Sequence, residues 1–234
     1  MVRLLFLIGV VEITFFLSTA YPQIDDTGEI NSLDKLRSEL RSAPKNEALR
    51  LLLAQQYLDT GKKADAIELL RQGTELDPNN YELHAKICPL YLEINQPDKA
   101  ILHGEQAMRL KPHSAVSYFN TGLAYGKKGL PREALRLFYE AYRIEPDNPE
   151  YLYNLGVVYF NLEDYENSIA FYRKTLEKDP QDARAYFNIG TIYNILGKKE
   201  QAVAELRKAL DILGPFTPEG ERTIEYIEDI RKQP

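Results

Sequence analysis

Histidine and cysteine are the residue types in this chain that most readily bind metals or act as nucleophiles. The sequence has one cysteine, Cys88, and three histidines, His84, His103 and His113. A metal site needs a cluster of such ligands, and here no second cysteine or paired carboxylate stands at ligand spacing. Cys88 is expected to be a buried small residue, because reactive thiols sit in exposed, electropositive surroundings. The sequence therefore predicts no metal site and no cofactor.

Short motifs that accompany catalysis are also missing from the sequence. It contains no glycine-rich phosphate loop, no nucleophile elbow and no HExxH pair. The many aspartate and glutamate residues stand at helical spacing, which is typical of a solvated surface. We therefore expect a protein that is not an enzyme.

A repeated pair of an aromatic residue and an asparagine points to binding instead. The asparagines follow one another at intervals of 34 residues: Asn120, Asn154 and Asn188. The aromatic residues directly before them are Phe119, Tyr153 and Phe187. An amide both donates and accepts hydrogen bonds, so it can hold the backbone of an extended peptide, and a ring beside it supplies contact area. Together with Phe160 on the same helix face, these residues form the predicted peptide-binding site.

The 34-residue interval runs through most of the chain and predicts a repeat architecture. Prolines that stop helices recur at this interval: Pro44, Pro78, Pro112, Pro146 and Pro180. They divide the chain into five units: 47–80, 81–114, 115–148, 149–182 and 183–216.

Within each unit, small residues mark the place where two helices would cross. Position 8 of the unit is Ala, Cys or Gly, position 20 is Ala or Ser, and position 11 is always Tyr. Two antiparallel helices approach closely only where side chains are small, and large neighbours fill the space beside the crossing. Gly61, Gly129 and Gly197 at position 15 are expected to end the first helix in the left-handed conformation. Each unit is therefore predicted to be a helix pair.

The third unit shows the whole set of landmarks at Tyr118, Thr121-Gly122, Tyr125, Ala134, Phe138 and Pro146. This pattern resembles the tetratricopeptide repeat. The resemblance implies an all-α, right-handed superhelical solenoid of stacked antiparallel helix pairs, in which the first helix of each pair lines the concave face. It also implies binding of partner proteins, and the asparagines are similar to the ladder that holds extended peptides in O-GlcNAc transferases. Because asparagine at position 6 is common in this family, a background role for the ladder stays open.

Both ends of the stack are predicted to carry caps, since open ends of a solenoid need polar covers. Residues 21–46 are read as a polar linker and a leading helix, 32–43, that forms the second half of a degenerate repeat. Residues 217–234 contain a capping helix over 218–231.

The second unit departs from the pattern of the others. Pro89 falls inside its first helix, and Gly104 replaces the large residue at position 24. Two interpretations remain open: a tolerated kink, or a hinge between the first two units and the last three.

The first 20 residues have the layout of a secretory signal peptide. A basic start is followed by the apolar run "LLFLIGVVEITFFL" and by a small-residue end at Ala20, where cleavage is expected. The alternatives are an uncleaved membrane anchor and a cytosolic apolar tail. An anchor is disfavoured because the run is shorter than about 20 residues. Glu12, which lies inside the run, disfavours insertion as well. We expect the protein in the periplasm or secreted, and at a membrane only if this segment is uncleaved.

Charge and composition narrow the class of partner. The chain has 234 residues, a net charge of -6 and a sequence pI of about 5.3. An acidic protein without basic clusters is a poor match for nucleic acid. The resulting hypothesis is an extracytoplasmic scaffold that binds protein or peptide partners, for example in the assembly of an envelope, secretion or pilus machine. The alternatives are a membrane-tethered assembly subunit and a substrate-recruiting partner of a separate glycosyltransferase or protease.

Overall fold

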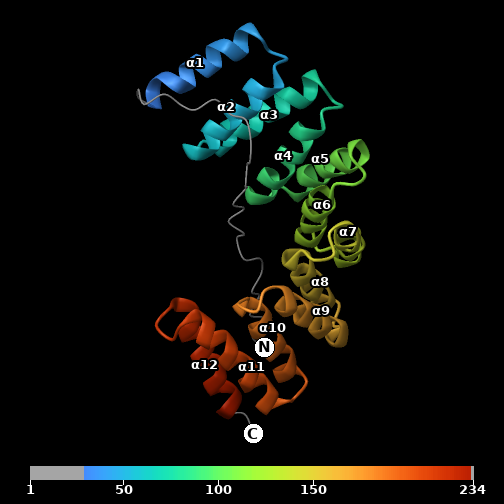
Figure 1. Cartoon of the computed structure of the whole chain (residues 1–234), viewed down its shortest axis with the longest axis vertical. Helices are drawn as coiled ribbons and strands as arrows, with labels where there is room; N and C mark the ends of the chain where they lie inside the picture. Colours follow the sequence, from blue (N-terminus) through green and yellow to red (C-terminus); the bar gives the residue numbers. More distant parts are fainter. Residues whose placement is uncertain (1–28, 233–234) are drawn as a thin grey trace.

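A computed structural model describes residues 29–232, which form twelve α-helices and no strand (Figure 1). The helices are α1 (Glu29–Ser42), α2 (Glu47–Asp59), α3 (Lys63–Leu76), α4 (Tyr81–Glu93), α5 (Pro97–Leu110), α6 (Ala115–Lys127), α7 (Pro131–Ile144), α8 (Pro149–Asn161), α9 (Tyr165–Lys178), α10 (Ala183–Ile195), α11 (Lys199–Leu213) and α12 (Pro218–Lys232). Helices α2 to α11 form five successive pairs, which confirms the predicted all-α solenoid.

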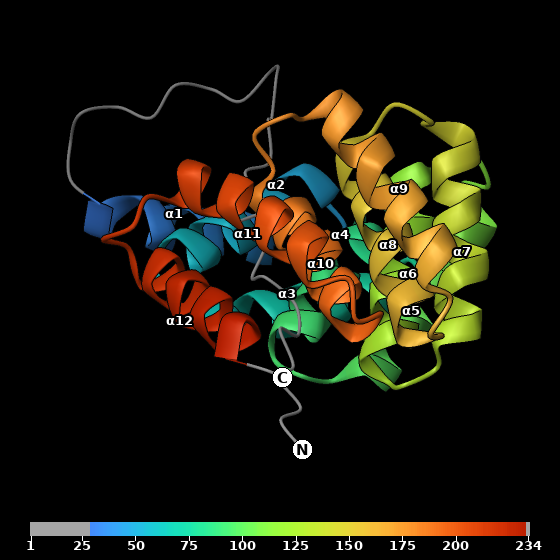
Figure 2. The ribbon, with the colours of Figure 1, turned by 90° about the horizontal axis from the view of Figure 1, so that it is seen from below.

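The pairs are stacked in an arc from α1 at one end to α12 at the other (Figure 1). In the middle of the stack, α4, α6 and α8 lie on the inner side of the arc, and α5, α7 and α9 lie on the outer side. The view along the stack places α6 and α8 towards the middle of the molecule and α7 at its edge (Figure 2). We call the surface formed by the first helices, α2, α4, α6, α8 and α10, the inner face.

The turn between the two helices of a pair has the same geometry in all five units. The residue at position 15 has a positive φ in each: Gly61 (72°), Asn95 (57°), Gly129 (80°), Glu163 (61°) and Gly197 (71°). The next residue donates its backbone N–H to the carbonyl of the position-11 tyrosine, as Lys62 does to Tyr57 at 2.7 Å. This six-to-one bond is that of a Schellman cap, which satisfies a carbonyl at the helix end. The three glycines therefore behave as predicted, and asparagine and glutamate adopt the same conformation at the two other turns.

The start of each first helix is fixed by a cap that also repeats every 34 residues. The capping residues are Asn46, Asn80, Ser114, Asn148 and Asp182, and the side chain of each accepts a backbone N–H of the following first turn. Such a cap stabilises a helix by about 1 kcal/mol. Loops of three or four residues between capped helices thus keep the units in register.

Small residues close the crossing of the two helices, as the sequence predicts. Every position-20 residue, from Ala66 to Ala202, is fully buried. A Cβ added to Gly122 would lie 2.6 Å from the ring of Phe138, and one added to Gly156 would lie 2.7 Å from the ring of Tyr172. In these two units the glycine at position 8 therefore makes room for the aromatic side chain of the second helix.

In the second unit, the departures from the pattern have a packing explanation. Helix α4 runs through Pro89 without ending, and the Pro89 side chain is buried. At Gly104 an added Cβ would lie 2.2 Å from the hydroxyl of Thr121 on α6. The glycine thus lets the third unit approach the second closely, and whether Pro89 acts as a hinge stays a prediction.

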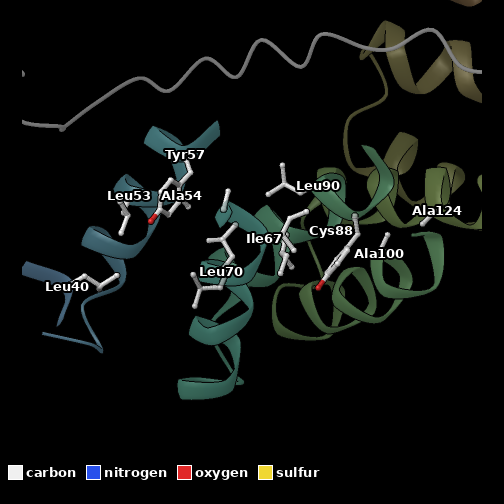
Figure 3. Packing of buried hydrophobic residues seen from close by; sticks show 14 residues of the cluster. Leu40, Leu53, Ala54, Tyr57, Ile67, Leu70, Cys88, Leu90, Ala100 and Ala124 are labelled. Carbon is white, nitrogen blue, oxygen red and sulfur yellow. The ribbon is translucent and has the colours of Figure 1, made fainter. Parts of the chain in front are cut away.

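The core changes in character along the stack. From α1 to α6 it is mostly aliphatic, with Leu40, Leu53, Leu70 and Leu90 among the buried side chains (Figure 3). From α6 onwards it contains many rings, among them Phe138, Phe171 and Tyr172. At the end of the stack, α12 covers the fifth pair with Ile227 and Ile230.

Within residues 29–232, no helix is both long and apolar enough to cross a membrane. The predicted signal peptide, residues 1–20, lies outside the described residues.

Candidate functional site

The seven residues predicted to bind peptide come from three successive first helices of the inner face. Phe119 and Asn120 lie on α6, Tyr153, Asn154 and Phe160 on α8, and Phe187 and Asn188 on α10. The helical repeat places each asparagine at the same position of its unit. Their environments nevertheless differ from one unit to the next.

The pair on α6 is more enclosed than its sequence suggests. Asn120 is only 6% exposed, so it is not the freely accessible amide that the pattern predicts. Phe119 packs between units, with ring centroids 5.5 Å from Phe138 and 4.8 Å from Tyr151 of the fourth unit. The contact with Tyr151 joins the third and fourth units, and this pair therefore contributes mainly to packing.

Asn154 on α8 is half-buried and uses its amide N–H groups within its own helix. Its Nδ2 donates to the backbone carbonyl of Glu150 at 2.8 Å and to the Glu150 carboxylate at 3.2 Å. These bonds fix the orientation of the amide plane. The side-chain oxygen of Asn154 is the atom left to accept a hydrogen bond from a partner.

Asn188 on α10 is also half-buried and links two units. Its Nδ2 donates to the hydroxyl of Tyr153 at 3.0 Å. Tyr153 packs against Tyr172, with ring centroids 5.5 Å apart, and burial raises the pKa of its hydroxyl. Phe160, the seventh predicted residue, packs against Tyr165 with centroids 5.9 Å apart. The amide of Asn188 and the ring of Tyr153 thus form one rigid surface across two units.

The inner face continues to the capping helix α12, beside which one side-chain amide has an unpaired oxygen. Phe187 packs against Tyr226 of α12, with ring centroids 5.8 Å apart. Asn194, at position 12 of the fifth unit, donates through Nδ2 to the Tyr226 hydroxyl at 3.1 Å. Its Oδ1 is buried and has no hydrogen-bond partner among the described residues. An unpaired buried carbonyl oxygen costs stability, and a buried atom is not accessible to a docked peptide.

A network of charged groups borders the amides of α8 and α10. The Arg184 guanidinium donates to Asp182 at 2.8 Å and to Glu150 at 3.0 Å, and it lies 4.3 Å from the centroid of the Tyr153 ring. Burial disfavours its charge, but the hydrogen bonds that it donates to Asp182 and Glu150 outweigh this and raise the pKa of Arg184. The guanidinium is therefore permanently charged and held in one orientation over the ring.

The cysteine and two of the histidines, the residues best suited to bind a metal or act as a nucleophile, are buried in the packing of the second unit. His84 and His103 are buried, with their Nδ1 atoms 3.0 Å apart, and His84 Nε2 lies 3.2 Å from the Pro78 carbonyl. Burial raises the pKa of the Cys88 thiol to about 12, so it is protonated at neutral pH. Within residues 29–232 there is no group of three or more His, Cys, Asp or Glu side chains that could hold a metal ion. Around α8 and α10, the inner face offers shape, amides and the fixed positive charge of Arg184.

Three family profiles described as tetratricopeptide repeat match residues 32–87, 119–183 and 171–204. The chain is a tetratricopeptide repeat protein. The first match begins at residue 32, at the predicted leading helix. Residues 88–118, which include Pro89 and Gly104, lie between the matches, in the unit that departs most from the pattern.

Solved structures give the same fold. This tetratricopeptide repeat protein is similar to MamA, with 26% sequence identity and a TM-score of 0.65 over 74% of this chain and 98% of that one. It is also similar in fold to YrrB, a protein with an unusual peptide-binding site, with 18% identity and a TM-score of 0.67 over 83% and 100% of the two chains. The third, PilW, is a type IV pilus biogenesis factor, with 18% identity and a TM-score of 0.73 over 84% and 90%. No curated protein matches the sequence.

Sequence reasoning missed Glu150, Arg184, Asn194 and Tyr226. The first two stand at position 2 of their units, and Asn194 stands at position 12, on the face already chosen. A search for polar residues recurring on that face could have found Asn194. The partnership with Tyr226 depends on how α12 docks, which the repeat pattern does not contain.

Proposed function

We propose that this tetratricopeptide repeat protein is a non-enzymatic scaffold that binds an extended segment of a partner protein on its inner face. The observation that carries the proposal is the pair of half-buried, oriented amides of Asn154 and Asn188 on adjacent helices. Asn154 offers a carbonyl oxygen whose direction is fixed by the bonds from Nδ2 to Glu150. Acceptors of this kind suit the N–H groups of an extended backbone.

Rings beside these amides supply the apolar part of the surface. Tyr153, Phe160 and Phe187 are each partly exposed, and each is held by a neighbouring ring. Rigid rings give contact area at a low entropic cost. Phe119 and Asn120 take part in the proposal only as support, because Asn120 is buried.

A peptide selected from a random twelve-residue display library on the immobilised protein provides the ligand for the test. We expect the double variant Asn154→Ala/Asn188→Ala to bind this peptide roughly five- to a hundredfold more weakly, as two lost neutral hydrogen bonds would predict. The matched control is Asn120→Ala, which changes the same repeat position where the side chain is buried and should leave the affinity nearly unchanged. Affinities come from fluorescence polarisation, and thermal unfolding checks that the variants remain folded. Unchanged affinity in the double variant would place the binding surface elsewhere.

The proposed place of action is outside the cytoplasm, in the assembly of an envelope, secretion or pilus machine. Support comes from the apolar run followed by Ala20 and from the shared fold with PilW. N-terminal sequencing of the protein from its native cells should then find Tyr21 as the first residue. Retention of Met1 on protein that resists carbonate extraction would favour the membrane-tethered alternative.

A further inference from the structure

A pocket opens on the inner face in the first two units, far along the stack from the asparagines. Its volume is about 200 Å³. The rim consists of half-buried side chains of α2, including Leu51, Leu52 and Leu58, and the floor includes the buried Leu70 and Leu90. Lys86 of α4 forms one wall.

The pocket lies where the first unit has smaller residues than the rings of the third unit. Position 24 is Leu70 in the first unit and Phe138 in the third, where the ring fills the space beside Gly122. Position 5 is likewise Leu51 in place of Phe119. Position 6 is Leu52, where the last three units have asparagine. The differences at positions 24 and 5 remove volume from the inner face, and Leu52 replaces a polar side chain with an apolar one at the same point.

We infer that this pocket takes one apolar side chain, aliphatic or aromatic, from the extended partner segment, with an acidic residue of that segment beside Lys86. The inference rests on the proposed function and names the chemistry of its partner. A cavity of about 150 Å³ lined by aliphatic side chains holds a group the size of benzene, so one large side chain fits here. Burial of such a side chain is the main driving force that a pocket of this kind offers.

Charge complementarity accounts for the acidic residue. Lys86 is half-buried, and burial lowers the pKa of its amine, whereas the carboxylate of Glu82 one turn away acts in the opposite direction. A second carboxylate arriving with the partner would further stabilise the charged amine in this partly desolvated position. A basic residue at the same place would be repelled. The pocket therefore distinguishes partner segments by charge as well as by size.

Variants copied from the later units test the inference on the peptides selected by display. Leu52→Asn introduces the residue that position 6 carries in the last three units, at a rim site outside the buried core. We expect it to lower the affinity for the selected peptide about ten- to a hundredfold, which is the loss that follows when one large apolar side chain is no longer buried. A version of the selected peptide with serine in place of the apolar anchor should bind weakly to the wild type. Its affinity should not change further in Leu52→Asn.

A second variant fills the pocket from beneath. Ala54→Gly/Leu70→Phe reproduces the pair Gly122 and Phe138 of the third unit. This variant should also bind the peptide more weakly, while the protein still unfolds in a cooperative thermal transition. Lys86→Glu should reverse the preference between peptides with aspartate and with lysine beside the anchor.

The outcomes separate this inference from the proposed function. Loss of affinity in Asn154→Ala/Asn188→Ala but not in either pocket variant would overturn the pocket and keep the asparagine site. Loss in the pocket variants alone would keep the pocket and remove the asparagines from the site. A concentration-dependent dimer in sedimentation that Leu52→Asn abolishes would assign the pocket to a second copy of the chain and overturn the inference.

Discussion

The first two units and the last three solve the same packing problem with different side chains. At position 24, the third and fourth units place Phe138 and Tyr172 against a glycine of the first helix, whereas the first unit places Leu70 beside Ala54. The rings fill the inner side of the pair, and the leucine leaves a pocket of about 200 Å³. The aliphatic residues of the first unit thus leave a hollow where the rings of the third and fourth units fill the inner face.

The two regions also differ at position 4, on the packed face of the first helix. In the first two units this position carries buried polar groups, Arg50 and His84. Arg50 donates to the carbonyls of Pro44 at 2.7 Å and Leu69 at 2.9 Å, and burial lowers the pKa of its guanidinium. In the fourth unit Leu152 is there and is fully buried. At this position the first region is held by hydrogen bonds that must stay paired, and the fourth unit by apolar packing.

The largest difference between the regions should appear when leucine is placed at position 8. In Gly156→Leu even the Cβ would lie 2.7 Å from the Tyr172 ring, so we expect a loss of about 3 kcal/mol in the free energy of unfolding. Ala54→Leu adds a similar volume beside the open pocket and should cost only about 1 kcal/mol. Urea unfolding followed by circular dichroism measures both. Equal losses would show that the pocket gives the first unit no spare volume.

Much of this comparison could be predicted from the sequence, because the stack is specified by residues close together along the chain. The glycines at position 15, the small residues at positions 8 and 20 and the period of 34 determine the helix pairs before any contact is known. The repeating caps from Asn46 to Asp182 are equally local, since each side chain bonds the first turn of the helix that follows it.

The site was harder to predict because its details depend on contacts between units. The pattern treats Asn120 and Asn188 as equivalent, yet the first is buried and the second donates to a tyrosine 35 residues earlier. Such contacts depend on the packing of neighbouring helices, which a single repeat does not specify. The pocket illustrates the same point, because Leu70 lacks the ring that Phe138 supplies at the same position of the third unit.

Acid should loosen the first region before the second. Burial lowers the pKa of His84, and burial together with the charge of His84 lowers the pKa of His103 to about 4. Both titrate near 6.5 in the unfolded chain, so as the pH falls below 6.5 the unfolded chain takes up these protons before the folded chain does, down to about pH 4 for His103. Stability from the pair is complete above this window and decreases as the pH falls through it, by on the order of 2 kcal/mol. Arg109 opposes protonation of His84 and Asp77 favours it.

Hydrogen exchange at pH 7 and pH 4.5 measures this effect region by region. Peptides of α4 and α5 should lose protection at the lower pH, whereas those of α8 and α9, where the sequence has no histidine, should change less. The control is His84→Leu/His103→Leu, which takes its residues from Leu152 and Leu137 at the same positions. If this variant keeps the full acid sensitivity of α4 and α5, the carboxylates and not the imidazole pair are responsible.

The smallest difference concerns the ion pairs that join neighbouring units. In the last region Glu205, whose side chain is 8% exposed, accepts from both terminal nitrogens of Arg173 at 2.5 and 3.2 Å, and this raises the pKa of Arg173. In the first region Lys63 and Glu93 are 2.5 Å apart, but each side chain is 42% exposed. Glu205→Gln should therefore cost about 1–2 kcal/mol because a charge-assisted, two-pronged bond is lost away from water. Glu93→Gln should cost less than about 0.5 kcal/mol, since solvent screens the exposed pair and two flexible side chains regain freedom. Thermal unfolding in low and high salt tests both, and a Glu93→Gln loss as large as that of Glu205→Gln would contradict burial as the cause.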